Sequence, residues 1–143
     1  MTRTLKVLNG KYDNLKIYGT NYLTHDGTCI RDYIHVSDLV SAHIKALEYL
    51  IKNKTSDIFN LGYGRGYSVL EVVNVSEEVT GKKVPVMITG QREGDVDKVI
   101  ADNQKAINKL NWKPQFDSLS DIIKTAWDWE KKITDNCKIL HKA

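Results

Sequence analysis

The sequence has few cysteines, few prolines, no long hydrophobic run and no excess of one charge, and each shortage excludes a class of protein. Two cysteines in 143 residues, Cys29 and Cys137, provide neither a disulfide framework nor the ligand clusters of a zinc site. We therefore expect two reduced thiols and no bound metal. No stretch approaches the ~20 apolar residues that span a bilayer, and the opening MTRTLKVLNGKY is not a signal peptide. The sequence predicts a cytoplasmic protein with no membrane partner.

The charges are balanced and dispersed along the chain. Twenty-one Lys and Arg oppose 18 Asp and Glu, for a net charge of +3. Nucleic-acid-binding proteins concentrate their basic residues in a stripe, and the one modest basic cluster here, residues 131–142, is more typical of a solvated helix end. We expect no nucleic-acid partner. With only Pro85 and Pro114 and no linker-like stretch, residues 1–143 are predicted to form a single domain.

Four segments have the apolar periodicity of helices. They are residues 38–53, 68–80, 103–111 and 118–136. In the first, one face carries apolar side chains at intervals of four, three and four residues: Val40, Ile44, Leu47 and Ile51. The second begins with Ser68 and Glu71 in the pattern of a capping box, and Gly81 ends it.

Strand-like segments lie between these helices. They are residues 15–18, 29–36, 58–61 and 84–88. Pro85 cannot donate a ladder hydrogen bond, which restricts the last strand to an edge or makes the proline its first residue. Strands that alternate with helices predict an α/β fold.

Two patterns suggest a dinucleotide-dependent enzyme but fail in detail. Gly62, Gly64 and Gly66 follow a strand-like segment, yet a G-x-G-x-x-G fingerprint needs its third glycine at position 67, which is tyrosine. A tight turn is favoured over an NAD site. Tyr12 and Lys16 have the spacing of a catalytic Tyr–Lys pair, but they lie in a turn and a strand, where that spacing does not align side chains. We predict no catalytic and no cofactor-binding residue.

Two clusters have the chemistry of phosphate binding. If residues 29–36 are extended, Arg31, Tyr33 and His35 share one face. A guanidinium fork matches phosphate oxygens, and a neighbouring phenol donates a further hydrogen bond. In the second cluster, Arg92 suits another phosphate edge and Asp95 suits sugar hydroxyls. The alternative is that each arginine forms a surface ion pair with a nearby aspartate, and the sequence alone does not decide between the two.

The run YGTNYLTHDGTCIRDYIHVSDL, followed by IFNLGYGRGYSVLEVV, REGD and ADNQKAINKLNWKP, resembles UDP-glucose 4-epimerases, which are extended short-chain dehydrogenase/reductases. The resemblance covers about residues 8–130 and is most specific in DGTCIRDYIHVSDL. It implies that residues 1–143 are the C-terminal UDP-sugar-binding region of such an enzyme. The implied fold is α/β, a small mixed sheet with about four helices, without the N-terminal NAD-binding Rossmann domain.

The resemblance also implies the residues that bind the nucleoside. It implies that Tyr18 lies beside the uracil, with the backbone at Lys16 near the edge of the base. Val69 forms part of the wall around the nucleoside, and Asp95 accepts hydrogen bonds from the ribose.

On the phosphate and sugar side, the resemblance implies that Arg31 and Arg92 bind the diphosphate, with Tyr33 beside them. Gln91 stands where the family often has arginine, which weakens one charge contact. Val99 replaces a tyrosine of some relatives, and the family associates a smaller residue there with N-acetylated sugars.

The implied function is a share in the interconversion of UDP-glucose and UDP-galactose, within galactose and nucleotide-sugar metabolism. The family is an NAD-dependent isomerase, but its catalytic Tyr/Lys half is not in this sequence, so we expect no activity and no NAD binding from this chain alone. The expected partners are a UDP-sugar and an N-terminal epimerase fragment, which would dock on an apolar surface. The alternatives are a non-catalytic UDP-sugar-binding remnant, a subunit that completes a split epimerase and, least favoured, a 4,6-dehydratase or UDP-glucuronate epimerase.

Overall fold

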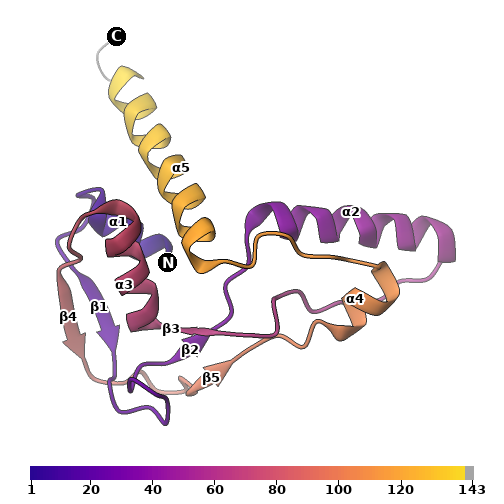
Figure 1. The fold of residues 1–143 in the computed structure, drawn as a ribbon, viewed down its shortest axis with the longest axis horizontal. Helices are drawn as coiled ribbons and strands as arrows, with labels where there is room; N and C mark the ends of the chain where they lie inside the picture. Colours follow the sequence, from indigo (N-terminus) through magenta and orange to yellow (C-terminus); the bar gives the residue numbers. More distant parts are fainter. Residues whose placement is uncertain (141–143) are drawn as a thin grey trace.

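The computed structural model describes residues 1–140, and the side chains of residues 1–134, as helices joined by short strands (Figure 1). The elements follow the order α1 (Thr2–Leu8), β1 (Leu15–Tyr18), β2 (Ile30–Arg31), α2 (Val36–Asn53), β3 (Tyr67–Ser68), α3 (Val69–Thr80), β4 (Val86–Thr89), β5 (Lys98–Val99), α4 (Gln104–Leu110) and α5 (Leu119–Leu140). The Cys137 side chain and the end of the basic cluster, residues 141 and 142, lie outside the described parts.

The elements form two regions (Figure 1). The lobe contains α1, α3, α5 and both sheets, and the arm contains α2, α4 and the segment 54–61 that leaves α2. Figure 1 shows α2 projecting sideways from the lobe with α4 beneath its far end, while α5 rises from the junction. None of the described helices is both long and apolar enough to cross a membrane. The cytoplasmic location stays a prediction.

The strands form one parallel pair and one mixed sheet. In the first, β1 pairs with β4, and Leu15 is opposite Val86. The Leu15 amide donates to the Pro85 carbonyl at 2.8 Å, so the proline lies at the start of a strand whose single described neighbour is β1. In the second, β2 lies between antiparallel β3 and parallel β5. The small mixed sheet and the edge position predicted for residues 84–88 are confirmed.

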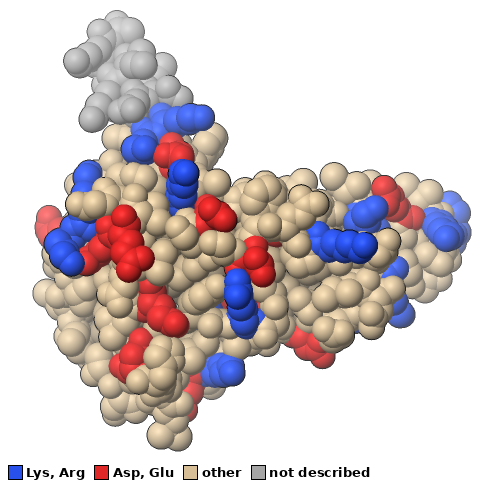
Figure 2. All heavy atoms as spheres, viewed as in Figure 1, with Lys and Arg blue, Asp and Glu red and all other residues tan. Residues whose placement is uncertain are grey.

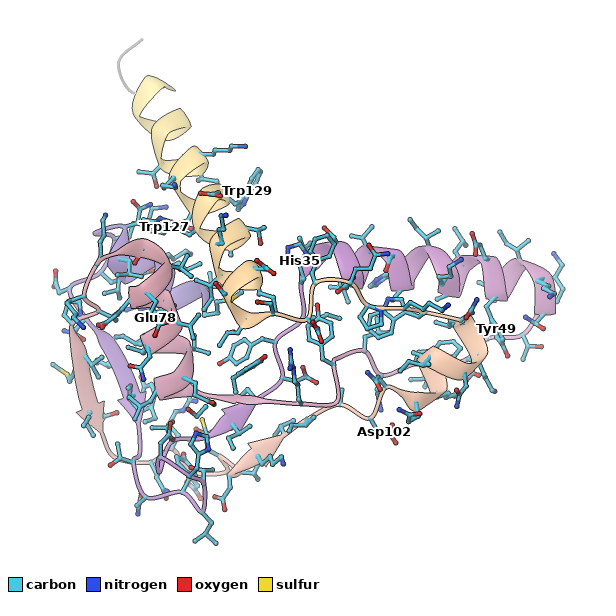
Figure 3. The ribbon with its side chains drawn as sticks, viewed as in Figure 1. His35, Tyr49, Glu78, Asp102, Trp127 and Trp129 are labelled. Carbon is cyan, nitrogen blue, oxygen red and sulfur yellow. The ribbon has the colours of Figure 1, made fainter. Side chains whose placement is uncertain are left out.

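Each region has its own buried cluster. In the lobe, α1, α3 and α5 pack together around β1; the cluster contains Leu5, Val7, Leu8, Leu15, Val72, Val73, Val84, Leu119, Ile123 and Trp127. In the arm, a smaller cluster joins α2 to α4 and contains Ala42, Ala106, Leu110 and Trp112. Figure 3 shows Trp127 on the side of α5 that faces the lobe and Trp129 on the side that faces the arm.

The predicted start and end of α3 are confirmed. The Ser68 hydroxyl accepts from the Glu71 amide at 3.0 Å, and the Glu71 carboxylate accepts from the Ser68 amide at 2.6 Å. Gly81 follows the helix with φ +67°, a left-handed conformation that glycine adopts at little cost.

The strand predicted over residues 29–36 is wrong beyond Arg31. His35 instead caps α2: its Nδ1 accepts from the Ser37 amide at 3.1 Å, and its ring stacks on Phe116 with centroids 4.5 Å apart. The Asp38 carboxylate then accepts hydrogen bonds from residues 115 and 116, which pulls the chain away from the sheet. Figure 3 shows His35 at the start of α2 beside the foot of α5. Arg31 and His35 therefore do not share a strand face, and His35 is a structural residue.

The strand predicted over residues 58–61 does not form. The segment pairs with none of the described strands, although Phe59 and Leu61 pack on the arm cluster and Ile58 is 82% exposed. A strand needs a neighbour to satisfy its backbone groups, and the described residues supply none here. The sequence also gave no indication of α1 and β5, which are too short to show a clear periodicity.

The helix predicted over residues 38–53 is confirmed as α2, but its apolar face is not buried. Val40, Ile44, Leu47 and Ile51 are 52–59% exposed. A neighbouring cavity of about 520 Å³ lies between α2 and α5, and its lining, which includes Ile34, Leu39, Ile122 and Trp129, carries no charged side chain. Figure 2 shows that the surface between α2 and α5 is largely uncharged, whereas charges of both signs are spread over the lobe. The apolar surface expected from the sequence is present.

Candidate nucleotide-binding site

Two arginines from distant parts of the chain converge on one carboxylate. Arg31, at the end of β2, lies 3.5 Å from Asp95 Oδ1 through a terminal nitrogen. Arg92, in the loop after β4, approaches Asp95 Oδ2 with Nε at 3.0 Å and a terminal nitrogen at 2.9 Å. The ion-pair alternative is thus realised, but one shared aspartate brings both guanidinium groups to a single place. Such a pair of forks is suited to the adjacent oxygens of a diphosphate.

The two guanidinium groups are held differently. Arg31 donates to the carbonyls of Ile30 at 2.8 Å and Val96 at 3.0 Å, and its side chain is 27% exposed. The Arg92 side chain is 58% exposed. Arg31 is therefore fixed by backbone, whereas Arg92 is held by side chains that can release it.

Tyr18 lies beneath the second arginine. It is the last residue of β1, and the Arg92 Cζ lies 4.4 Å from the centroid of its ring, within the range of a cation–π contact. Lys16 is two residues earlier in the same strand and faces outward with Tyr18, while Leu15 and Ile17 are buried. The structure thus brings Lys16, Tyr18, Arg31, Arg92 and Asp95 to one end of the lobe.

Gly19 is a site residue that the sequence analysis missed. Its φ is +82°, and its amide donates to Thr89 at 2.9 Å, which ties the end of β1 to the end of β4. A Cβ at this position would clash with the Gln91 side chain and lie 2.9 Å from a ring carbon of Tyr22. Only glycine lets the two loops approach this closely. The G-T-N turn letters were a signal for the bend but not for the contact.

Tyr22 is a second residue that the sequence analysis missed. Its ring is buried, and its hydroxyl has no hydrogen-bond partner among the described residues. Burial, together with the nearby Asp95 carboxylate, raises the pKa of the Tyr22 phenol above its ordinary value. A neutral phenol therefore lies beneath the arginine cluster.

Asp26 organises the loop before β2. Its carboxylate accepts from the Thr28 amide at 2.9 Å and the Thr28 hydroxyl at 2.8 Å, and it also accepts from the Ser68 hydroxyl. Burial disfavours the charge of Asp26, but the hydrogen bonds from Ser68 and Thr28 outweigh this and lower its pKa. The loop is thereby anchored to the start of α3, and the D-G-T letters are the signal of such a turn.

The remaining predicted residues lie at the edges of this cluster. Val99 is opposite Arg31 in the β2–β5 ladder, and both line a cavity of about 570 Å³ that also includes Asp32. Tyr33 packs against the lobe cluster, and burial raises the pKa of its phenol. Val69 begins α3, directly after β3. Their placement makes Val99 a neighbour of the arginines, whereas Tyr33 is held mainly by the core.

The glycine loop does not fit a dinucleotide. A Cβ on Gly62 would clash with the Asp32 carboxylate, and a Cβ on Gly66 would lie 2.5 Å from Ile30. The Gly62 carbonyl accepts from the Asn103 side chain at 2.6 Å, so the loop is packed against its own chain. The α3 start is capped by Glu71 rather than left open for a phosphate. This loop is therefore a packed turn, and the absence of NAD binding by the chain stays a prediction; similar solved structures contain bound NAD.

The Tyr12–Lys16 pair is likewise not a catalytic dyad. Tyr12 lies in the turn after α1 with the Arg3 guanidinium 3.2 Å above its ring, while Lys16 lies in β1. No helix joins them, so the four-residue spacing does not place one beside the other.

A sequence model of the family described as GDP-mannose 4,6 dehydratase matches residues 2–125, and the chain belongs to this family. Curated proteins that are similar to this chain include UDP-glucose 4-epimerases. The chain is 49% identical over 123 residues to the UDP-glucose 4-epimerase of Rhizobium leguminosarum bv. trifolii, a match that covers 86% of this chain and 37% of that protein.

Solved structures agree. The UDP-glucose-4-epimerase of Stenotrophomonas maltophila, solved with bound NAD and formylated UDP-arabinopyranose, superposes with a TM-score of 0.88 at 38% identity, covering 93% of this chain and 39% of that one. The UDP-Glc/GlcNAc 4-epimerase of Campylobacter jejuni gives 0.84 at 44% identity, covering 92% and 40%. The predicted resemblance and the α/β fold are confirmed. The chain spans between 35% and 40% of the length of the curated relatives it matches, as a C-terminal portion of an epimerase-like enzyme would.

Proposed function

We propose that residues 1–143 act as the uridine- and diphosphate-binding region of a UDP-glucose 4-epimerase-like enzyme, and that NAD and the catalytic groups come from another polypeptide portion. The observation that carries this proposal is the convergence of Arg31 and Arg92 on Asp95 beside the Tyr18 ring. Together these side chains offer two forks for a diphosphate, an acceptor for ribose hydroxyls and an aromatic face for a base.

The ligand class follows from the same chemistry and from the relatives. A UDP-sugar such as UDP-glucose or UDP-galactose would extend from the arginines towards the cavity beside Val99. The half-exposed Val99 leaves room there, which supports acceptance of an N-acetylated sugar. In an enzyme reconstituted from this chain and the catalytic portion of a UDP-glucose 4-epimerase, we expect measurable turnover of both UDP-GlcNAc and UDP-glucose. Val99→Tyr should selectively reduce the turnover of UDP-GlcNAc. Undetectable UDP-GlcNAc turnover contradicts this part.

The first experiment is calorimetric titration of the chain with UDP-glucose, with UDP-galactose and, separately, with NAD. We expect both UDP-sugars to bind and NAD not to bind. Arg31→Ala and Arg92→Ala should each weaken UDP-glucose binding about tenfold or more, the loss of a charge-assisted contact. Arg3→Ala is the matched control, because Arg3 is also an exposed arginine over a tyrosine ring but lies on α1. Absence of UDP-sugar binding would favour a remnant that has lost the site.

The apolar surface of α2 supports a protein partner. We propose that the arm docks a globular polypeptide equivalent to the portion of the relatives that this chain does not span, which is more than half of their length. The exposed face of Val40, Ile44, Leu47 and Ile51 continues towards the mainly apolar cavity beside α5. Apolar patches of this extent mark interfaces more often than free surface.

Co-expression with the remaining portion of a UDP-glucose 4-epimerase tests this docking. We expect a stable complex and NAD-dependent epimerisation of UDP-glucose. Ile44→Asp combined with Leu47→Asp should abolish the complex while the chain keeps its fold. Lys45→Asp on the same helix is the control, because Lys45 lies outside the apolar face and pairs only with Glu48 at 3.3 Å among the described residues. A complex that survives the double substitution contradicts the assignment of the interface.

A further inference from the structure

Arg92 contacts both side chains that the proposed function assigns to the nucleoside, the Tyr18 ring and the Asp95 carboxylate. Its guanidinium lies 4.4 Å above the centre of the Tyr18 ring, where a base would stack. Its Nε and a terminal nitrogen lie 3.0 and 2.9 Å from the Asp95 oxygen that would accept from a ribose. A base can take this face of Tyr18 only after the guanidinium has moved.

The contacts of Arg92 allow such a movement. Its side chain is more than half exposed, and among the described residues it contacts one ring face and one carboxylate. Arg31, in contrast, donates to two backbone carbonyls and is shielded. Leaving this position costs Arg92 an exposed cation–π contact of about 0.5–1 kcal/mol and an ion pair with Asp95 that is weak for the same reason, since the guanidinium is exposed to solvent, whereas a phosphate offers new charge-assisted hydrogen bonds in their place. A phosphate can therefore draw Arg92 away from the ring, whereas an uncharged nucleoside cannot.

We infer that Arg92 is a phosphate-dependent gate over Tyr18, which competes with the base for the ring until a diphosphate engages the guanidinium. This inference rests on the proposed function and deepens it, because it makes Arg92 a specificity-determining residue against nucleosides that lack phosphate. Every ligand whose base stacks on this face of Tyr18 must displace Arg92, which costs the free energy of its contacts. Only a phosphorylated ligand offsets this loss, through new contacts with the displaced guanidinium. Arg31, fixed by backbone carbonyls, is an anchor without this role.

The test compares uridine with UDP on the whole chain, in a buffer without phosphate, followed by NMR so that millimolar affinities are measurable. Arg92→Ala should strengthen uridine binding about two- to fivefold, the factor that corresponds to one exposed cation–π contact, and weaken UDP binding about tenfold or more. Arg31→Ala should weaken UDP binding and leave uridine binding unchanged. Arg3→Ala, which removes a guanidinium from the Tyr12 ring instead, should change neither.

A second arm uses inorganic pyrophosphate as the probe. Added to the unmodified chain, it should strengthen uridine binding by drawing Arg92 off Tyr18, and the same addition to Arg92→Ala should have no such effect. The inference is overturned if Arg92→Ala binds uridine no better than the unmodified chain, if no variant binds uridine, or if pyrophosphate acts equally on both. If UDP does not bind, but Arg92→Ala gains uridine affinity and pyrophosphate strengthens uridine binding in the unmodified chain alone, the gate stands and the proposed function fails.

Discussion

The lobe and the arm bury their apolar side chains to different degrees. In the lobe, residues from three helices and β1 close over a cluster that includes the fully buried Ile123. In the arm, three buried residues of α2 and α4 pack around Trp112, which follows α4, while the opposite face of α2 stays exposed. Both regions have helices of clear periodicity, so periodicity identifies an apolar face but not what covers it. The arginine cluster lies in the lobe, the region that completes its own core.

The largest expected effect is the loss of the arm's central side chain. Trp112→Ala removes a buried indole that also donates to the Asp38 carbonyl at 3.1 Å and the Ser41 hydroxyl at 3.0 Å. We expect a cost of about 3–5 kcal/mol. Because the two clusters are separate, hydrogen exchange should rise in α2 and α4 while α3 stays protected.

If Trp112→Ala raises hydrogen exchange in α3 as much as in α2 and α4, the lobe and the arm unfold as one unit rather than separately. Ile123→Ala in the lobe cluster is the reciprocal variant. It should raise exchange in α3 and α5, at a cost of about 2–5 kcal/mol.

Gly19→Ala tests whether the site can be damaged without touching the arm. The left-handed backbone and the crowding by Gln91 and Tyr22 should cost about 1–3 kcal/mol and weaken UDP binding, with exchange in α2 unchanged. Gly10→Ala is the matched control: its φ is +73°, but no described atom lies within 4 Å of the added Cβ. A control that weakens UDP binding as much would mean that backbone strain, not crowding at the site, is responsible.

Tyr22→Phe removes the buried hydroxyl that has no partner among the described residues. We expect the free energy of unfolding to rise by about 1 kcal/mol, because a desolvated polar group is lost and the ring still packs. Thermal unfolding measures this. A loss of stability would show that the hydroxyl makes a contact in solution, and Tyr22 would then belong to the site in its own right.

The smallest expected effect is a pH dependence in the arm. Hydrogen bonds from Lys105, the Ile58 amide and Lys109 lower the pKa of Asp57 to about 2, from an ordinary value of 3.8. The folded state thus binds a proton less readily than the unfolded one, so Asp57 contributes stability above pH 3.8 that is lost as the pH falls through about 2. The difference in Tm between the unmodified chain and Asp57→Asn should shrink over this window, and a constant difference would contradict it.

Local chemistry was predictable from the sequence, and contacts between distant segments were not. The capping box of Ser68 and Glu71 and the edge position at Pro85 depend on neighbouring residues alone, and both are confirmed. The strand over residues 58–61 failed because pairing depends on a neighbour that no local pattern reveals. The strand over residues 29–36 failed because the His35 side chain caps a helix.

The candidate site shows the same division. Arg31, Arg92 and Asp95 were chosen for their chemistry, but their meeting on one carboxylate depends on the β2–β5 ladder and on the loop after β4. Gly19 and Tyr22 were missed because the role of Gly19 comes from its closeness to Gln91 and that of Tyr22 from its burial beside Gly19, which the residues around them in the sequence do not reveal. An exposed apolar surface was expected from the resemblance, but its location on the periodic face of α2 was not.

The strands of the mixed sheet that carries Arg31 are only two residues long, so the direction of this side chain depends on an exact register. Arg31 is opposite Tyr67 on one side and Val99 on the other. Sliding β2 by a single residue would turn the guanidinium to the opposite face and empty the site of its anchor. Gly66 permits the observed register, because Ile30 lies where any larger side chain at this position would stand. The third glycine of the loop thus has a use unrelated to a dinucleotide: it leaves the space that Ile30 fills next to Arg31 in the register that presents the guanidinium to the site.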